Sequence, residues 1–113
     1  MLQRVYVCSP YRGDVENNIR RAKEAARLIA LKGYFPVVPH IYLTQFLDDS
    51  KEDERNLGLS LGIDLLENCA ALCQVGDHIS SGMSAEIERA KQLNIPIVKL
   101  DVDGKGVSGT FQL

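Results

Sequence analysis

Cysteine is scarce in this 113-residue sequence, and the three that occur form no C-x-x-C pair. An odd number of cysteines argues against a disulfide framework, so Cys8, Cys69 and Cys73 are predicted to be buried, reduced thiols. Reduced thiols are typical of a cytoplasmic protein. Cys69, Cys73 and His78 could approach a single metal ion, but no fourth ligand is evident. We therefore predict a cytoplasmic location and no metal site.

The sequence also lacks an excess of charge and any long apolar run. Its net charge of −2 provides no basic field for a polyanion, so nucleic acid polymers are not expected as partners. No apolar stretch reaches membrane-spanning length, and Arg4, Cys8 and Ser9 interrupt any signal-peptide pattern. Hydrophobic residues make up 45% and charged residues 25%, as in an ordinary soluble chain. The expected protein is one domain over residues 1–113, without membrane contact.

Short apolar runs alternate with segments of helical spacing along the chain. The runs predicted to be strands are residues 4–8, 34–39, 70–75 and 95–100. The segments predicted to be helices are residues 15–32, about 52–68 and 80–94. Prolines in the second run indicate a strand end or an edge strand, while 40–50 and the glycine-rich tail receive no assignment. The alternation predicts a single-domain Rossmann-like (flavodoxin-like) α/β three-layer sandwich, with a parallel sheet of four or five strands.

Glu86 lies on the apolar side of the predicted helix at 80–94, where an acidic side chain needs a reason. A capping box would need serine or threonine three residues earlier, but position 83 is methionine. A glutamate at the edge of the core, reaching water, is the alternative. The functional interpretation is a carboxylate at a cleft, kept ionised by the positive helix end and suited to attack an electrophilic carbon.

Asp64 is a second acid on an apolar helix side, the side that Leu57, Leu61 and Leu65 define. A surface acid on a wrongly placed helix is an equally good explanation. If both acids meet at one cleft, different surroundings would separate their pKa values and let them divide the chemical work.

The loops that follow the predicted strands would meet at the carboxyl edge of the sheet, where ligands bind. In SPYRGD, helix N–H groups and the Arg12 guanidinium suit an anion, and Gly13 makes the turn. This stretch is neither a dinucleotide fingerprint nor a Walker loop, so on its own an ordinary turn is the simpler interpretation. In SSG at 80–82, one serine is expected to cap the helix and the other to be free for an anion.

Two further segments carry polar residues whose simpler interpretation is structural. His40 follows a strand and could line a cleft, although a lone histidine after a proline more often has a structural role. The acidic stretch at 48–54 is expected to be a solvated loop or helix start, with a mobile lid as the lesser alternative.

Taken in order, the motifs resemble a known enzyme superfamily. A strand followed by (G/S)-x-x-R-G, a helical aspartate in mid-chain, and S-x-G-x-x-x-E before a strand are similar to the nucleoside 2-deoxyribosyltransferase superfamily. The branch of 2′-deoxynucleoside 5′-monophosphate N-glycosidases is the most similar, and the resemblance covers nearly the whole chain. Pro10, Tyr11, Met83 and Ser84 depart from the usual pattern, and 40–56 matches no motif.

The resemblance implies a role for each matching residue. Glu86 matches the nucleophile, and Asp64 matches the acid that assists near the leaving base. Ser80 stands where the nucleoside-using branch has aspartate. A carboxylate there would repel phosphate, whereas a hydroxyl can bind it. Ser108 matches a serine that a neighbouring subunit delivers to the phosphate, which implies at least a homodimer with a shared site. The full expected substrate-binding set is Ser9, Tyr11, Arg12, Gly13, His40, Ser80, Ser81, Gly82 and Ser108.

The function expected from this resemblance is hydrolysis of the N-glycosidic bond of a (deoxy)nucleoside 5′-monophosphate, with no metal or organic cofactor. A nucleoside deoxyribosyltransferase is one alternative, since it differs only in whether a second base or water meets the intermediate. A non-catalytic nucleotide-binding or sensing module is another. A structural domain without a small-molecule site is the third.

Overall fold

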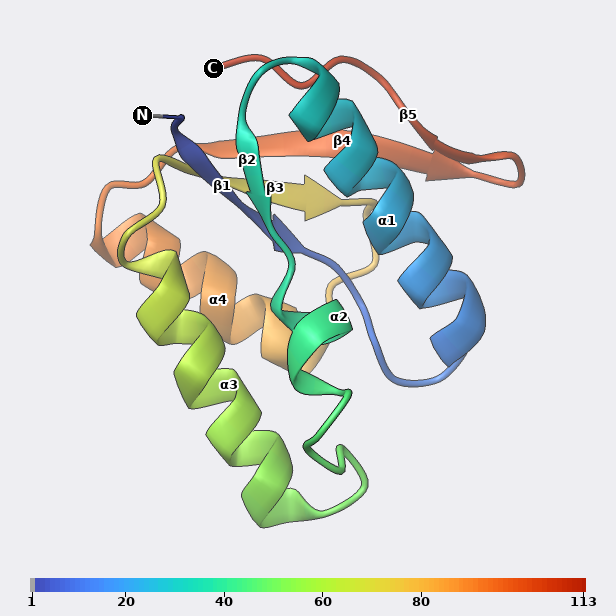
Figure 1. The fold of residues 1–113 in the computed structure, drawn as a ribbon, viewed down its shortest axis with the longest axis vertical. Coiled ribbons are helices and arrows are strands. Elements are labelled where there is room, and N and C mark those ends of the chain that lie inside the picture. The colour runs from blue at the N-terminus through green and yellow to red at the C-terminus, as the bar shows by residue number, and fades with distance from the viewer. Residues whose placement is uncertain (1) are drawn as a thin grey trace.

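The structure, a computed structural model, describes residues 2–113. Alternating strands and helices fill this part of the chain (Figure 1). In chain order the elements are β1 (Arg4–Cys8), α1 (Val15–Leu31), β2 (Phe35–Val37), α2 (Pro39–Leu43), α3 (Glu52–Leu66), β3 (Ala71–Val75), α4 (Ser81–Gln92), β4 (Ile97–Asp103) and β5 (Gly106–Ser108).

The strands form one sheet in the order β2-β1-β3-β4-β5. The first four strands are parallel, and Tyr6 of β1 lies between Val37 of β2 and Leu72 of β3. This order is that of the flavodoxin-like folds, so the predicted fold class is confirmed. Only β5 departs from the parallel direction, because a tight turn after Asp103 returns the glycine-rich tail antiparallel to β4. A turn this short can join only antiparallel strands.

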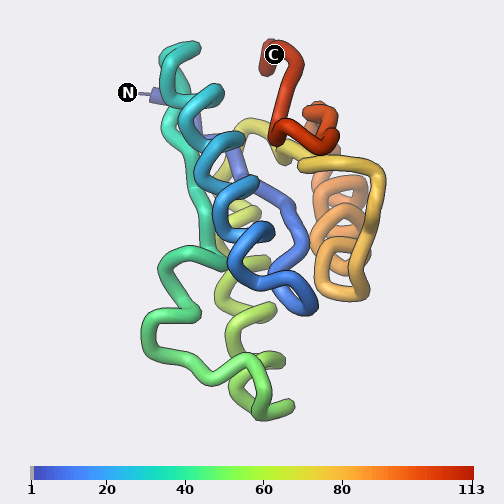
Figure 2. The backbone as a smooth tube through the Cα atoms, turned by 90° about the vertical axis from the view of Figure 1, so that its right-hand side faces the viewer, coloured from blue at the N-terminus to red at the C-terminus, as the bar shows by residue number. Residues whose placement is uncertain are grey.

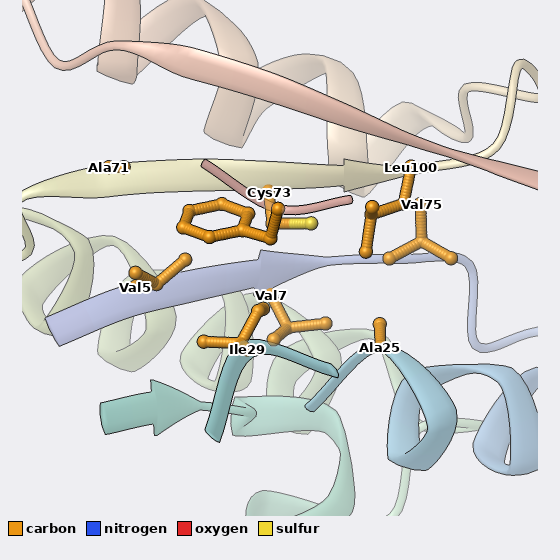
Figure 3. Close-up of a cluster of buried hydrophobic side chains, with 9 residues drawn as sticks. Val5, Val7, Ala25, Ile29, Ala71, Cys73, Val75 and Leu100 are labelled. Atoms are coloured by element: carbon orange, nitrogen blue, oxygen red, sulfur yellow. The ribbon is translucent and has the colours of Figure 1, made fainter. Parts of the chain in front are cut away.

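Helices cover both faces of the sheet and divide the core into two clusters. Figure 2 separates α1 from α4 on opposite sides of the strands. In the cluster beneath α1, Ile29 packs with Val5, Val7 and Cys73. Figure 3 shows these side chains grouped beside β1 and β3. The cluster beneath α3 and α4 contains Tyr6, Cys8, Cys69, Leu66, Leu72, Met83, Ile87 and Ala90. All three cysteines are buried and unpaired, as predicted.

Two predictions about the second strand meet different outcomes. The strand is an edge strand, as its prolines indicated, because Pro36 cannot donate a ladder hydrogen bond. The segment after it was given no assignment, yet it forms the short helix α2. Pro39 supplies the fixed φ suited to a first helical turn, so this helix begins at a proline.

Helix α3 buries a different face from the one predicted. Leu57, Leu61 and Leu65 are 48%, 40% and 41% exposed, whereas Gly62 and Leu66 are buried. A Cβ atom on Gly62 would lie 2.7 Å from the Tyr6 Oη and 3.6 Å from Glu86 Oε2. The missing side chain therefore lets α3 approach the sheet, and close approach of the helix decides which face is buried.

Within residues 2–113, every helix is too short or too polar to be a candidate for crossing a bilayer.

Candidate active site

A cavity of about 300 Å³ opens beside the carboxyl ends of β1 and β3. Its walls come from the loops after β1 and β3, from α2 and the loop that follows it, from one side of α3 and from the first turns of α4. Parallel strands place helix N-termini and loops at this edge, at the point where strand order reverses. Seven of the predicted site residues line the cavity: Tyr11, Arg12, His40, Ser80, Ser81, Gly82 and Glu86.

Glu86 is 2% exposed and is held by two donors from β1. The Tyr6 hydroxyl donates a hydrogen bond to Oε2, and the Cys8 thiol lies 3.6 Å from Oε1. Side chains two residues apart on a strand share a face, so β1 presents both donors to α4. Sequence reasoning missed both residues, although this alternation was the available signal.

Burial governs the charge of Glu86. Desolvation raises the pKa of its carboxyl to about 7, and the hydrogen bonds from Tyr6 and Cys8 oppose that rise. The prediction that the helix end keeps it ionised is therefore wrong below about pH 7. Glu86 is the sixth residue of α4, and the field of a helix terminus fades beyond its first turn. Burial also raises the pKa of Tyr6 and of Cys8, so both remain protonated donors.

The N-terminus of α4 points into the same cavity. Ser80 is the N-cap, and its Oγ accepts a hydrogen bond from the Met83 N–H at 3.3 Å, so the prediction that one serine caps the helix is confirmed. A capping serine keeps its own O–H free to donate. Ser81 begins the helix, and a Cβ on Gly82 would meet no atom within 4 Å. Open space at Gly82 and unpaired helix N–H groups make this rim suitable for an anion.

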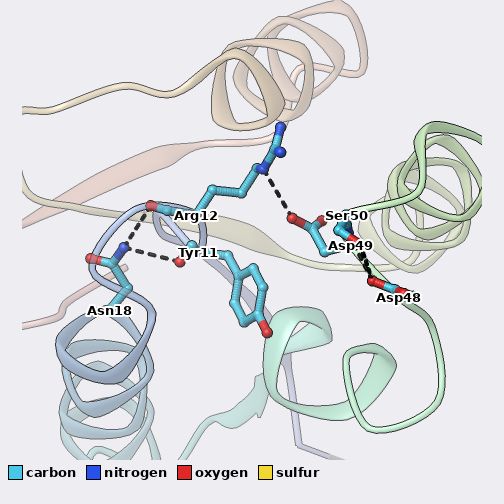
Figure 4. A network of polar contacts seen from close by, with 6 residues as sticks. All are labelled: Tyr11, Arg12, Asn18, Asp48, Asp49 and Ser50. Carbon is cyan, nitrogen blue, oxygen red and sulfur yellow. Dashed lines mark hydrogen bonds and ion pairs between the residues drawn. The ribbon is translucent and has the colours of Figure 1, made fainter.

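Arg12 borders the cavity from the loop after β1. Its Nε lies 3.2 Å from Asp49 Oδ2, and Figure 4 shows the arginine reaching toward the loop that carries this acid. The amide of Asn18 fixes the arginine's backbone by donating to the carbonyls of Tyr11 and Arg12, each at 3.1 Å. Sequence reasoning identified neither Asn18 nor Asp49, because both partners come from outside the quoted motif.

Aromatic rings form another wall of the cavity. Tyr11 and His40 stack with ring centroids 6.0 Å apart and 20° between their planes. Burial lowers the pKa of His40, and the nearby charge of Asp49 only partly opposes this shift. The imidazole is therefore neutral at neutral pH and offers one donor and one acceptor.

Four predicted site residues lie away from the cavity lining. Asp64 is exposed on α3, because Gly62 takes the buried face and a residue two positions later points the other way. Ser108 is exposed on β5. Gly13, with φ of +92°, shapes the turn without reaching the cavity.

Ser9 is buried, but it is not part of the lining, and its hydroxyl has no hydrogen-bond partner among the described residues. The Cys8 side chain points at Glu86, and side chains of successive residues in extended backbone point in opposite directions. The Ser9 side chain is therefore directed away from Glu86.

The described part of the chain contains no cluster of side chains arranged to bind a metal ion. No three histidine, cysteine, aspartate or glutamate side chains of residues 2–113 gather as metal ligands would. Cys69 and Cys73 belong to the two clusters on opposite faces of the sheet, so they cannot converge.

Solved structures share this fold over nearly the whole chain. A 2-deoxyribosyltransferase from the psychrotolerant bacterium Bacillus psychrosaccharolyticus matches with a TM-score of 0.72 and 12% identity, over 97% of this chain and 86% of its own. A 2-desoxiribosyltransferase from Leishmania mexicana matches with a TM-score of 0.63 and 17% identity, over 95% and 79%. A conserved protein from Enterococcus faecalis V583 matches with a TM-score of 0.62 and 19% identity, over 93% and 67%. The chain thus has the deoxyribosyltransferase fold.

Residues 3–100 match a family model described as "Domain of unknown function (DUF7768)", and the chain belongs to this family. No curated protein sequence matches it significantly.

Proposed function

We propose that this protein hydrolyses the N-glycosidic bond of a (deoxy)nucleoside 5′-monophosphate, with Glu86 as the nucleophile. The observation that carries the proposal is a nearly fully buried carboxylate, held by Tyr6 at the wall of a cavity whose rim contains Arg12 and the start of α4. A buried acid with a shifted pKa beside a cavity is typical of catalytic groups. On this proposal, residues 1–113 form one nucleoside 2-deoxyribosyltransferase-like domain.

The rim supplies phosphate recognition. Arg12 provides a planar set of donors, and the start of α4 provides backbone N–H groups with the hydroxyls of Ser80 and Ser81. Phosphate bound at this rim would leave the sugar nearer to Glu86, which lines the same cavity four residues beyond Gly82. Binding energy from the phosphate then orients the reacting carbon.

The reaction follows the double displacement of retaining glycosidases. A Glu86 oxygen attacks C1′ as the C1′–N bond breaks, and the bonding electron pair leaves with the base, which takes up a proton. The transition state resembles an oxocarbenium ion. Water then attacks C1′, loses a proton and releases Glu86 as a carboxylate.

The leaving base would lie at the end of the cavity formed by Tyr11, His40 and α3. Asp64 is exposed and off the cavity, so it is not proposed again as the proton donor. His40, Asp49 and Glu54 are among the titratable groups of the cavity lining, and a base can also be protonated by water. The stacked Tyr11 and His40 rings provide a surface suited to a flat heterocycle.

We also propose a homodimer in a reducing cytoplasm. The exposed ridge of α3, formed by Leu57, Leu61 and Leu65, is apolar on a helix whose other face is buried. Ser108 is exposed and away from its own cavity, so it could reach a phosphate only in a second subunit. The buried, unpaired thiols suit a compartment that keeps cysteine reduced.

The test is release of free base from purified protein. The substrates are the 5′-monophosphates of deoxyadenosine, deoxyguanosine, deoxycytidine and deoxyuridine, with their ribonucleotides. Wild-type protein should release base from at least one of them, and Glu86→Gln should not. Binding without turnover in both proteins would overturn the hydrolase proposal.

Two specific observations favour other functions. The fold similarity to two deoxyribosyltransferases favours transfer, which would appear as a new nucleotide when a second base is added. The exposed position of Asp64 favours a sensing module, because the acid expected at the leaving base is missing. Nucleotide binding that raises the melting temperature without any product would identify the sensing module.

A further inference from the structure

An ion pair between two loops crosses the edge of the cavity. Arg12 comes from the loop between β1 and α1, and Asp49 comes from the loop between α2 and α3. Both residues line the cavity, so the pair is part of its wall and not a remote surface contact. Figure 4 shows the two side chains approaching from separate segments of the chain.

Local hydrogen bonds brace each partner. Asp48 Oδ1 accepts from the Ser50 backbone N–H at 3.0 Å and from the Ser50 hydroxyl at 2.6 Å, which closes a turn around Asp49. The Asp48 backbone N–H donates to Glu54 at 3.1 Å, and this ties the turn to α3. With Asn18 holding the carbonyl of Arg12, the meeting of the two side chains is built into both loops.

Asp49 directs its charge to Arg12. Among residues 2–113, Asp49 has no other ion-pair partner within 4 Å, and the nearby Lys51 pairs with Glu54 at 3.6 Å. The side chain of Asp49 is 27% exposed and that of Arg12 is 60% exposed, so the pair is weak enough to open. An anion bound to Arg12 must therefore displace Asp49 or lie beside its negative charge.

We propose that Asp49 competes with a ligand phosphate for Arg12 and so lowers the affinity of the rim for any anion that must take Arg12 over. This inference rests on the proposed function, because it concerns the same phosphate rim. A phosphate monoester carries a charge of about −1.5 to −2 at pH 7 and outcompetes one carboxylate. An uncharged nucleoside has no group that can displace Asp49. The ion pair therefore weakens the binding of nucleoside monophosphates and leaves the binding of uncharged nucleosides unchanged.

The experiment compares affinities for 2′-deoxyadenosine 5′-monophosphate and 2′-deoxyadenosine by calorimetry. Every variant carries Glu86→Gln so that the ligand is not consumed. Asp49→Asn should tighten binding of the monophosphate about two- to fivefold, as expected for loss of one exposed ion pair, and leave nucleoside binding unchanged. In the Arg12→Gln background, adding Asp49→Asn should give no gain, because Arg12 is the group that Asp49 withholds.

Asp53→Asn is the matched control, because it removes the same charge from an exposed position off the cavity. It should leave both affinities unchanged, and an equal gain in this control would reduce the effect to net charge and overturn the proposal. Unchanged or weaker monophosphate binding in Asp49→Asn, or equal tightening of the nucleoside, would also overturn it. If wild-type protein still releases base in that case, the proposal for Asp49 is rejected and the proposed function is retained. If no variant binds either ligand and no base is released, both fail.

Discussion

The Tyr6 hydroxyl donates a hydrogen bond to the Glu86 carboxylate, and this bond joins β1 to α4 inside the core. The bond favours the ionised form of an acid whose pKa burial raises to about 7. Tyr6 therefore acts on the reaction through Glu86, as a positioning residue.

Removing this donor should change the pH dependence of base release. In Tyr6→Phe, the pKa of Glu86 should rise further above its ordinary value, because a bond to the charged form is lost. The acidic limb of the rate profile should move to higher pH, with the largest loss of rate near neutrality and a smaller loss at pH 9. Tyr34→Phe is the matched control, because Tyr34 packs against Phe111 in the other cluster. An unmoved profile in Tyr6→Phe would contradict the account.

Glu86→Gln should remove a pH-dependent term from stability. The folded pKa of Glu86 is raised from 4.5 to about 7, so its contribution to stability is greatest below pH 4.5 and is lost as pH rises through about 7. The wild-type unfolding free energy should fall between pH 4.5 and 8, relative to Glu86→Gln, by on the order of 3 kcal/mol. Urea unfolding of both proteins at several pH values measures this difference. Parallel stability curves would show that burial does not perturb Glu86.

Gly62→Ala should damage both packing and site. Its Cβ would lie 2.7 Å from the buried Tyr6 hydroxyl, so α3 or Tyr6 must move. Overpacking of this kind costs about 1–3 kcal/mol, and base release should fall with it. Gly58→Ala is the control on the same helix, since its Cβ would meet only Leu47 at 3.6 Å, an ordinary contact. That change should be neutral or stabilising by up to about 1 kcal/mol. Equal effects of the two changes in a denaturant titration would contradict the packing described for α3.

The leucine ridge of α3 can be tested by sedimentation velocity. Leu61→Glu places a charge in the middle of the ridge and should shift a dimer to monomer without unfolding, because Leu61 is exposed in one chain. Leu31→Glu is the control, since Leu31 is exposed at the end of α1 on the other side of the sheet. A dimer that survives Leu61→Glu would place the contact elsewhere.

The fold was predictable because buried parallel strands show as continuous apolar runs and helices show as periodic ones. Helix α3 misled the prediction, since its leucines imply a buried face while Gly62 allows a closer approach on another face. Glycine has no side chain and adds nothing to a hydrophobic pattern. A pattern of apolar residues therefore cannot reveal a helix face that packs closely because a glycine lies there. The antiparallel β5 was missed for a similar reason, because a short strand in a glycine-rich tail has little periodicity.

The site was predictable where it followed strand ends, and less so across segments. Glu86, Arg12 and the serines at 80 and 81 follow from position on the sheet edge. The placement of Asp64 failed together with the face of α3. The pKa of Glu86 depends on the depth of its burial, and the ion pair of Asp49 with Arg12 depends on how two loops meet. Neither could be predicted from local sequence.

The central claim is that Glu86 becomes bonded to the sugar, and mass spectrometry of the quenched protein tests it most directly. The protein would be mixed with the best substrate of the nucleotide panel, acid-quenched during turnover and digested. We predict a peptide that contains Glu86 and carries the mass of the sugar phosphate, absent from Glu86→Gln. Base release that continues at the wild-type rate in Glu86→Gln, with no adduct on either protein, would contradict the account.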